Sequence, residues 1–343
     1  MAGADGRSGF DTDVAIVGAG PVGLFAVFEC GMLEMRCAVV DALDVPGGQL
    51  SALYPEKPIY DIPGLPHVLA GGLVDNLMEQ IRPFAPSLHL GQQVTALNRA
   101  GNGWIVETSK GTAIRAKAVI VAAGVGAFGP NRPPLDGIEA FETTGSVQYL
   151  VKRKDDFAGK RIVVAGGGDS AVDWALALAP VATSIAVVHR RDKFRAAPDS
   201  VAKMKTLAAE GKIDLVVPYQ LAGLEGPGGR LEAVVVKTLD GAAKRLPADA
   251  LLAFYGLSQN LGPIAGWGLN LERGLVAVDP ATFAAGPDGV FAIGDIVTYP
   301  GKLKLILTGF AEAAAAAHAI YTRVHPDKEL HFEYSTTKGV PGA

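Results

Sequence analysis

Short apolar runs alternate with helical patterns along this chain, and this alternation predicts an α/β fold. The runs Val14–Val17 and Ala38–Val40 bracket an apolar helical stretch at Leu24–Glu29. A second pair of apolar runs, Arg161–Ala165 and Ser184–Val188, brackets another helical stretch. Strand–helix–strand units of this kind are typical of parallel sheets.

Further patterns predict the elements between and after these units. Residues Gly72–Phe84 have apolar positions at helical spacing, and Thr308–Tyr321 is an alanine-rich helix. Residues His89–Val94 and Trp104–Thr108 alternate as antiparallel strands do. Leu231–Val236 and Ala250–Phe254 are expected to be strands, and two further apolar runs are Val119–Gly124, which ends in small residues, and Phe291–Asp295, which ends in Gly-Asp.

The chain is long enough for two domains, and a segment rich in proline indicates where they divide. It has 343 residues, of which 49% are hydrophobic. Gly129–Pro134 is rich in proline and predicts a stiff crossing. We therefore expect two Rossmann-like nucleotide-binding domains, one discontinuous (residues 11–128 and 258–343) and one inserted into it (residues 129–257).

The first strand–helix unit contains the spacing Gly18-x-Gly20-x-x-Gly23 and ends its second strand with Asp41. In this context Gly18 permits a tight turn, Gly20 admits a pyrophosphate, and Gly23 lets helix and strand pack closely. The helix N-terminus then faces the phosphates. Asp41 is placed to accept hydrogen bonds from ribose hydroxyls. The alternative is a structural glycine-rich turn.

The second unit has the same plan but the opposite charge at its end. Gly166-Gly-Gly168-Asp169-Ser170-Ala fits G-x-G-x-x-A. Its second strand ends in His189-Arg190-Arg191, and Arg195 follows four residues later. An acid favours a free 2′-hydroxyl, whereas an arginine pair can hold a 2′-phosphate. The second unit is therefore predicted to prefer NADPH over NADH, unless these residues form only a solvated basic turn.

The stretch after Asp41 is dense in glycine, proline and tyrosine and predicts an ordered loop. Gln49 and Tyr54 are candidates to reach a planar ring, Tyr54 by stacking on it, although turn packing would also explain them. In a flavin fold, Asp295 would accept a hydrogen bond from the ribityl chain. The N-terminus of the helix that begins at Thr308 could face the flavin ring and favour its reduced anion.

Composition narrows the classes of function. The net charge is −4 and the pI is about 5.9, which argues against nucleic-acid binding through bulk charge. The only cysteines, Cys30 and Cys37, match neither a C-x-x-C nor a zinc pattern, and we expect buried free thiols. No signal sequence is evident, so a cytoplasmic location is expected. Lys152–Lys154 is a solvated face or part of a docking patch for an acidic protein.

Taken together, these motifs resemble the two-domain flavoproteins of the thioredoxin reductase family. That family carries a redox C-x-x-C shortly before the second glycine motif, whereas Val147–Phe157 has no cysteine here. Dithiol exchange requires a thiolate and a resolving thiol. The stretch Gly47–Asp61, the run Gly166–Trp174 and the tail around Tyr334 are closer to the thioredoxin reductase-like ferredoxin–NADP+ reductases.

This resemblance implies an FAD-dependent homodimeric enzyme that passes electrons between NADPH and ferredoxin or flavodoxin. It implies that no protein acid or base is catalytic, with Tyr54 stacking on one face of the flavin and Tyr334 covering the other, its own or that of the partner subunit. The implied FAD contacts are Gly18, Gly20, Pro21, Val22, Gly23, Asp41, Gln49, Val94, Phe128, Asp295 and Thr336, together with both tyrosines. The alternatives are a disulfide reductase that uses external thiols and a redox sensor whose flavin is not turned over.

Overall fold

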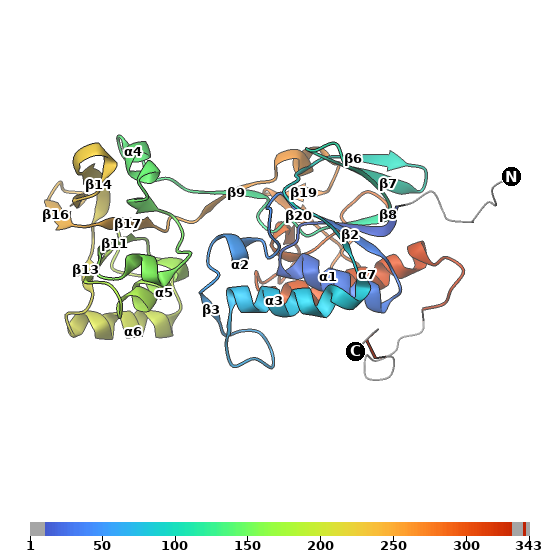
Figure 1. Ribbon diagram of the computed structural model, residues 1–343, viewed down its shortest axis with the longest axis horizontal. Coiled ribbons are helices and arrows are strands. Elements are labelled where there is room, and N and C mark those ends of the chain that lie inside the picture. The colour runs from blue at the N-terminus through green and yellow to red at the C-terminus, as the bar shows by residue number, and fades with distance from the viewer. Residues whose placement is uncertain (1–10, 331–338, 341–343) are drawn as a thin grey trace. The chain divides into compact units, whose positions relative to one another are not determined.

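The structure, a computed structural model, describes residues 11–330 and 339–340. The chain divides into two compact units, unit 1 (Met1–Phe128 and Gln259–Ala343) and unit 2 (Gly129–Ser258), each an α/β assembly (Figure 1). Unit 2 is thus an insertion in the sequence of unit 1. In the part of the chain that is described, no helix combines the length and the hydrophobicity needed to cross a bilayer.

Unit 1 is built on a mixed seven-stranded sheet. Its strand order is β5 (Ser87–His89), β2 (Cys37–Val40), β1 (Thr12–Val17), β8 (Ala113–Val121), β7 (Gly103–Thr108) and β6 (Val94–Ala100), and β21 (Val290–Ala292) also pairs with β8. Strands β1, β2, β5, β8 and β21 run parallel, whereas β6 and β7 form an antiparallel meander with β8. Because β8 is long, its second half joins the parallel part while its first half joins the meander.

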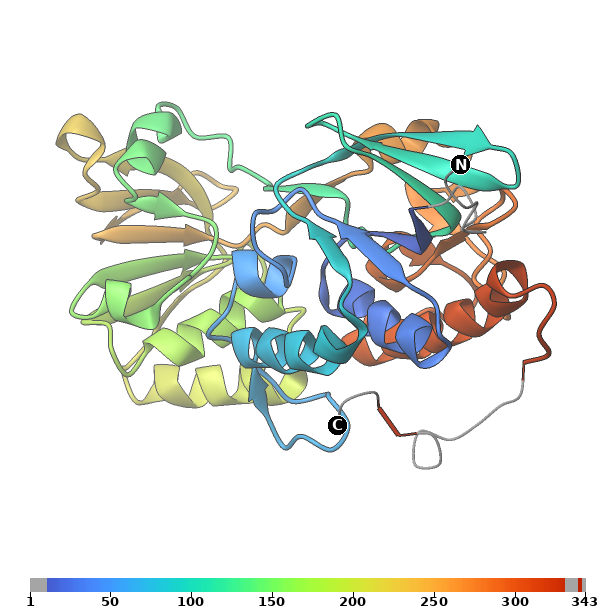
Figure 2. The same cartoon turned by 45° about the vertical axis from the view of Figure 1, so that its right-hand side comes forward.

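Successive residues of β1 point to opposite faces of this sheet and enter two separate cores. Val14 and Ile16 belong to one core, and Ala15 and Val17 to the other. The first core is covered by three helices that lie on the same side of the sheet (Figure 2). These helices are α1 (Pro21–Met32), α3 (Ala70–Ile81) and α7 (Ile306–Val324).

The remaining elements of unit 1 are short and lie in the connections. They are α2 (Gln49–Ala52), β3 (Pro58–Ile59), β4 (Val68–Leu69), η1 (Arg82–Phe84), η4 (Gly262–Gly266), β19 (Leu271–Glu272), β20 (Leu275–Ala277), η5 (Gly294–Ile296) and β22 (Val297–Thr298). Strand β9 (Ala127–Pro130) pairs with β18 (Leu257–Asn260) where the chain crosses between the units.

Unit 2 repeats the parallel plan on a smaller scale. Its sheet has the order β10 (Val147–Gln148), β17 (Ala250–Ala253), β11 (Arg161–Ala165), β12 (Ser184–Val188) and β13 (Asp214–Val216), all parallel. A separate antiparallel sheet contains β14 (Gln220–Glu225), β15 (Ala233–Lys237) and β16 (Ala243–Pro247). The α-helices are α4 (Ile138–Thr143), α5 (Asp169–Leu178) and α6 (Pro198–Ala209), and two short 3-10 helices are η2 (Lys154–Phe157) and η3 (Pro227–Gly229).

The periodic patterns predicted most of these elements, but one strand was wrong. The stretch His89–Val94 is not a continuous strand, because β5 ends at His89 and β6 begins at Val94. Between them Gly91 adopts a positive φ of 64°, and its N–H donates to the carbonyl of Leu43. The backbone there is bound to the loop that follows β2, so the alternation of side chains did not indicate a strand. Both cysteines are buried, as predicted.

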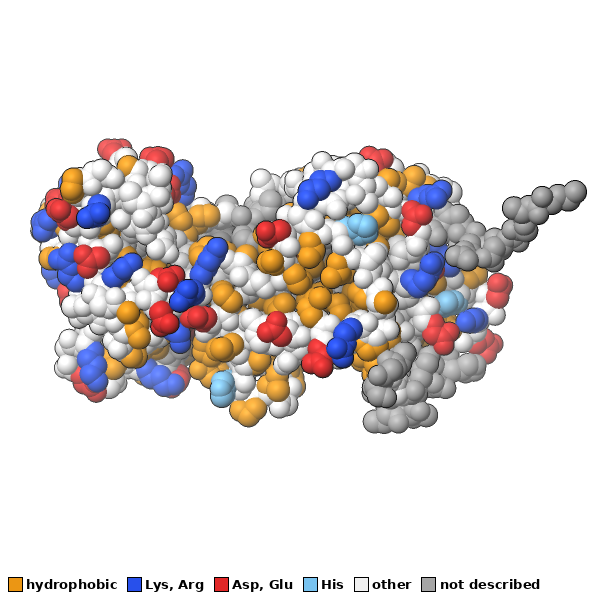
Figure 3. All heavy atoms as spheres, in the orientation of Figure 1, with side chains coloured by type: hydrophobic (Ala, Val, Ile, Leu, Met, Phe, Trp, Pro, Cys, Tyr) orange, Lys and Arg blue, Asp and Glu red, His pale blue; other side chains and the backbone are white. Residues whose placement is uncertain are grey.

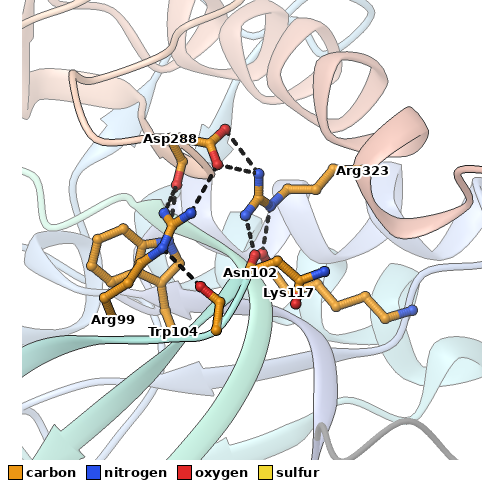
Figure 4. Close-up of polar contacts among 7 residues, drawn as sticks. Arg99, Asn102, Trp104, Lys117, Asp288 and Arg323 are labelled. Atoms are coloured by element: carbon orange, nitrogen blue, oxygen red, sulfur yellow. Dashed lines mark hydrogen bonds and ion pairs between the residues drawn. The ribbon is translucent and has the colours of Figure 1, made fainter.

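A cluster of charged side chains fastens the C-terminal end of α7 to the meander and to the turn before β21 (Figure 4). Arg323 binds both carboxylate oxygens of Asp288 at 2.8 and 2.9 Å and donates from Nε to the carbonyl of Lys117 at 2.7 Å. Arg99 pairs with the same carboxylate at 3.1 Å, and Trp104 Nε1 donates to the carbonyl of Asp288 at 3.1 Å. Hydrogen bonds from Arg323 and then Arg99 lower the pKa of Asp288.

Replacing Arg323 with Met should therefore loosen the end of α7. Because the change removes hydrogen bonds to a carboxylate and to backbone carbonyls, we expect an unfolding temperature lower by roughly 2–4 °C, equivalent to about 1 kcal/mol in a domain of this size. Differential scanning calorimetry measures the shift. The control is Arg115→Met, which removes an exposed ion pair with Asp11 at 3.5 Å and should change the unfolding temperature little. Equal shifts in both variants would contradict the special role of Arg323.

Candidate functional site

The turn between β1 and α1 contains glycines with different structural roles. Gly18 has a φ of 112°, and a Cβ there would lie 2.4 Å from the carbonyl oxygen of Ala122. A Cβ on Gly23 would lie 1.9 Å from the carbonyl oxygen of Gly18. A Cβ on Gly20 would meet nothing within 4 Å. Gly18 and Gly23 therefore permit close packing of backbone on backbone, whereas Gly20 faces open space in which a ligand can approach.

Helix α1 begins in that open space with its first N–H groups available. Gly20 is the N-cap residue and Pro21 the first helical residue, and in the described structure no side chain caps this end. Proline lacks an N–H, and its fixed φ suits the first helical position. The unpaired N–H groups and the positive end of the helix dipole form a site for an anion such as a pyrophosphate.

Asp41 follows β2 and holds the glycine turn against the end of that strand. Its Oδ2 accepts the N–H of Ala19 at 2.6 Å, and its Oδ1 accepts the N–H of Leu43 at 2.8 Å. Burial raises the pKa of Asp41, and the two backbone hydrogen bonds oppose that shift. A carboxylate has about four acceptor positions, so two hydrogen bonds to the backbone leave capacity for ribose hydroxyls.

The loop after β2 folds back onto the glycine turn. The N–H of Gly47 donates to the carbonyl of Ala19 at 2.8 Å. A Cβ on Gly48 would lie 3.1 Å from the Cα of Gly20. The amide nitrogen of Gln49 lies 3.7 Å from the position that a Cβ on Gly124 would occupy. The side chain of Gln49 thus lies near the residues that follow β8, beside the glycine turn.

The backbone just before Val94 is bound to the same region. The N–H of Gln92, two residues earlier, donates to the carbonyl of Asp41 at 2.9 Å. The side chain of Val94 is buried in the core behind β1. If Val94 contacts a bound nucleotide, the contact therefore comes from its backbone rather than from its side chain.

Tyr54 and Asp295 lie within electrostatic reach of each other although 241 positions separate them in the numbering. Burial, and then the negative charge of Asp295, raise the pKa of Tyr54 to about 12. Tyr54 is therefore a neutral phenol at physiological pH, which suits packing against an apolar ring. Phe128 lies in β9, but the position of its side chain is not described. Tyr334 and Thr336 lie outside the described residues.

The glycine turn of unit 2 has the same architecture at the start of α5. A Cβ on Gly166 would lie 2.6 Å from the carbonyl oxygen of Phe254. Gly168 is the N-cap residue of α5, and a Cβ there would meet nothing within 4 Å. Asp169 and Ser170 are exposed in the first turn of the helix. This turn too combines a tight backbone contact with an open approach to a helix N-terminus.

The basic loop after β12 is tied to that turn. The N–H of Arg195 donates to the carbonyl of Gly167 at 2.7 Å, and a Cβ on Gly167 would lie 2.3 Å from the ring of His189. Burial lowers the pKa of His189, and the charge of Arg190 acts in the same direction. The positive charge of this loop is therefore carried by its arginines and Lys193 rather than by the histidine.

The arginines themselves face solvent. Arg190, Arg191 and Arg195 are exposed, and no ion pair of theirs is found among the described residues. The N–H of Ala197 donates to the carboxylate of Asp169 at 2.8 Å, which fixes the end of the loop. The loop can therefore present its guanidinium groups to a phosphate without first breaking an internal ion pair.

Two features of the site were not singled out in the sequence. One is the packing of Gly48 against Gly20, for which the Gly47-Gly48 pair was the available signal. The other is Glu312, whose carboxylate accepts the N–H of Gly294 at 2.6 Å, next to Asp295. A lone acid in the alanine-rich run of α7 was the signal for that residue.

Comparison with known proteins places these features in context. Residues 12–318 match the family described as pyridine nucleotide-disulphide oxidoreductase. The chain is 64% identical over 332 residues to a ferredoxin–NADP reductase of Paramagnetospirillum magneticum, covering 96% of this chain and 98% of the relative. It is 60% identical over 335 residues to a ferredoxin–NADP reductase of Rhodospirillum rubrum, covering 96% and 97%.

Solved structures with a similar fold include thioredoxin reductases. The Lactococcus lactis thioredoxin reductase matches with a TM-score of 0.79 and 25% identity, covering 92% of this chain and all (100%) of that one. The T. acidophilum thioredoxin reductase matches with a TM-score of 0.80 and 22% identity, covering 91% and 98%. The predicted fold of two nucleotide-binding α/β domains is confirmed by these matches.

The two kinds of glycine in the first turn can be separated by a matched pair of variants. Gly23→Ala should lower the unfolding temperature of the apoprotein by roughly 2–12 °C, because overpacking costs about 1–3 kcal/mol. Gly20→Ala should leave that temperature almost unchanged but weaken FAD binding about tenfold, because the methyl group points where the pyrophosphate approaches. Calorimetry and flavin fluorescence titration measure the two effects. The assignment is wrong if Gly20→Ala binds FAD as tightly as the wild type.

Proposed function

Because the chain belongs to the pyridine nucleotide-disulphide oxidoreductase family and, within it, to the ferredoxin–NADP reductases, we propose that it transfers electrons between NADPH and ferredoxin through bound FAD. The observation that carries this proposal is the pair of glycine turns with opposite charge beside them. Asp41 lies at the turn of unit 1, and exposed arginines lie at the turn of unit 2. One chain therefore offers sites for two different dinucleotides.

Unit 1 has the features that FAD requires. The N-terminus of α1 would hold the pyrophosphate, with Gly20 leaving room for it, and Asp41 would accept the adenosine ribose hydroxyls. Asp295 would accept a hydroxyl of the ribityl chain, and Tyr54 would stack on the ring. When bound, flavin takes a hydride from a nicotinamide and releases electrons singly. The protein's own part is to bind and orient the reactants, so Tyr54 acts as a platform rather than as an acid.

Unit 2 has the features that NADPH requires. The N-terminus of α5 would hold the pyrophosphate, and Gly168 leaves the approach open. Arg190, Arg191 and Arg195 would bind the 2′-phosphate, since guanidinium groups bind phosphates in a bidentate manner. The hydrogen bond from the N–H of Arg195 to Gly167 links the two phosphate subsites. Preference for NADPH over NADH follows from this arrangement.

The two cysteines argue against a relay of electrons through thiols of this chain. Cys30 and Cys37 are both buried, in α1 and β2. The adjacent Cys30 side chain and burial raise the pKa of the Cys37 thiol, which disfavours the reactive thiolate. Disulfide reduction through this chain's own thiols is therefore not the function that these residues support.

We further propose that the enzyme is a homodimer that associates through unit 1. Hydrophobic side chains gather over α1 and α3 on the face of unit 1 seen in Figure 3. Phe25 and Phe28 of α1 are only partly buried, and they contact Phe310 and Phe84 at ring-centre distances of 4.7 and 5.8 Å. Contiguous apolar surface of this kind commonly marks a protein interface.

Steady-state kinetics with the variant Arg190→Ala test the phosphate subsite. Because the guanidinium would make charge-assisted hydrogen bonds to the 2′-phosphate, the KM for NADPH should rise about 10- to 100-fold. The KM for NADH, which lacks that phosphate, should change less than about threefold. Arg230→Ala, which changes another exposed arginine of unit 2, is the control and should leave both constants unchanged. Equal increases for both nucleotides would remove the assignment.

The proposed reaction is tested with purified protein reconstituted with FAD. NADPH-dependent reduction of cytochrome c should be slow without ferredoxin and rise at least about tenfold when ferredoxin is added, because ferredoxin carries single electrons to the cytochrome. Thioredoxin with a disulfide dye should support no turnover. Turnover with thioredoxin in place of ferredoxin would favour a disulfide reductase. Flavin that is bound but not reduced by NADPH would favour a redox sensor.

A further inference from the structure

A fully buried ion pair lies directly behind the turn that carries Asp295. The side chains of Glu312 and Lys302 are only 1% and 6% exposed and form a close salt bridge. Glu312 also accepts the Oη–H of Tyr299 at 2.7 Å and the N–H of Gly294 at 2.6 Å. Burial, followed by the hydrogen bond to Glu312, raises the pKa of Tyr299 above its usual range, so the phenol remains a donor.

This ion pair is not explained by stability alone. Removing two charges from water costs several kcal/mol per ion, and well-packed apolar residues of similar volume are often as stable or more so. A buried pair does, however, impose directional contacts that an apolar cluster cannot impose. The question is therefore which parts of the chain this pair holds in a fixed geometry.

Three segments meet at the carboxylate of Glu312. They are the turn after β21, which contains Gly294, the stretch after β22, which contains Tyr299 and Lys302, and helix α7 itself. Lys302 also lies over the ring of Tyr299, 5.7 Å from its centre. A single side chain of α7 thus determines where both preceding segments lie relative to that helix.

Each of these segments leads to a part of the proposed flavin site. Asp295 follows Gly294 directly, and α7 begins at Ile306, four residues after Lys302. In the described structure no side chain caps α7, so its first N–H groups are open to a ligand. The glycine turn is packed against the same place, because a Cβ on Gly309 would lie 2.3 Å from the side chain of Val22 and a Cβ on Gly294 would lie 3.6 Å from it.

We propose that Glu312 and Lys302 are positioning residues for the flavin end of FAD, an inference that rests on the proposed FAD site. By accepting the N–H of Gly294, Glu312 sets the direction in which Asp295 presents its carboxylate to the ribityl chain. By pairing with Glu312, Lys302 fixes the chain that enters α7 and so the position of the N-terminus of that helix. Neither side chain needs to touch FAD for this role.

Two double variants separate this role from the charge of the pair. Lys302→Met with Glu312→Gln removes both charges but keeps an oxygen that can accept the N–H of Gly294. Lys302→Met with Glu312→Leu removes both charges and the acceptor. If Glu312 positions the turn, the dissociation constant of FAD should rise about tenfold or more in the Leu variant and less than about threefold in the Gln variant.

The control is Arg323→Met, which loosens the other end of the same helix and lies outside the proposed FAD site. Flavin fluorescence titration of the apoproteins, their unfolding temperatures and the visible circular dichroism of bound flavin are measured together. The Leu variant should show an altered flavin dichroism. Arg323→Met should keep the wild-type dichroism and bind FAD within about twofold of the wild type, although its unfolding temperature falls.

Each outcome decides the matter. Equal dissociation constants for FAD in the two double variants would overturn the inference but not the proposed function. The same holds if Arg323→Met raises that constant as much as the Leu variant does at an equal loss of stability. Wild-type protein that binds no FAD would overturn the proposed function and the inference together. If the Leu variant does not fold, Glu312→Asp replaces it, because the carboxylate is then one methylene too short to reach Gly294. The same tenfold loss of FAD affinity is expected there, and wild-type affinity would refute the positioning role.

Discussion

Contact of backbone with backbone at the glycine turns is the constraint on which this structure depends. In unit 1 the carbonyl oxygen of Ala122 lies too close to Gly18 to leave room for a Cβ there, and the carbonyl oxygen of Gly18 does the same at Gly23. In unit 2 the carbonyl of Phe254 takes the same place beside Gly166. Because no side chain intervenes, strand, turn and helix meet closely enough for a helix N-terminus to open at the edge of the sheet.

The two units use this common device and differ in what surrounds it. In unit 1, the carboxylate of Asp41 accepts a hydrogen bond from the turn, and a second glycine pair, Gly47 and Gly48, packs against it. In unit 2, the basic loop is fastened through backbone hydrogen bonds, and its guanidinium groups remain in solvent. Under the proposed assignment, the same turn would serve two dinucleotides, with the charge at the end of the second strand selecting between their adenosine groups.

Helix α7 has ion pairs near both ends, one partly exposed and one buried, and the two have different roles. At its C-terminal end, Arg323 and Asp288 form a partly exposed cluster that fastens the helix to the meander (Figure 4). Near its N-terminal end, Glu312 and Lys302 are buried and contact the turn before Asp295. Exposed ion pairs contribute little specificity because water competes for both partners, whereas buried ones tolerate only a narrow range of geometries.

The sequence by itself determined the α/β class, the two glycine turns and the difference in charge between them. These depend on residues close together in the chain, where periodicity and glycine spacing report directly on backbone conformation. Only the tertiary structure decided that residues 90–93 break a predicted strand, that Tyr54 lies near Asp295, and that Glu312 supports the turn at Gly294. Such contacts join segments far apart in the sequence, and no local pattern specifies which distant group will satisfy a buried charge or an open backbone N–H.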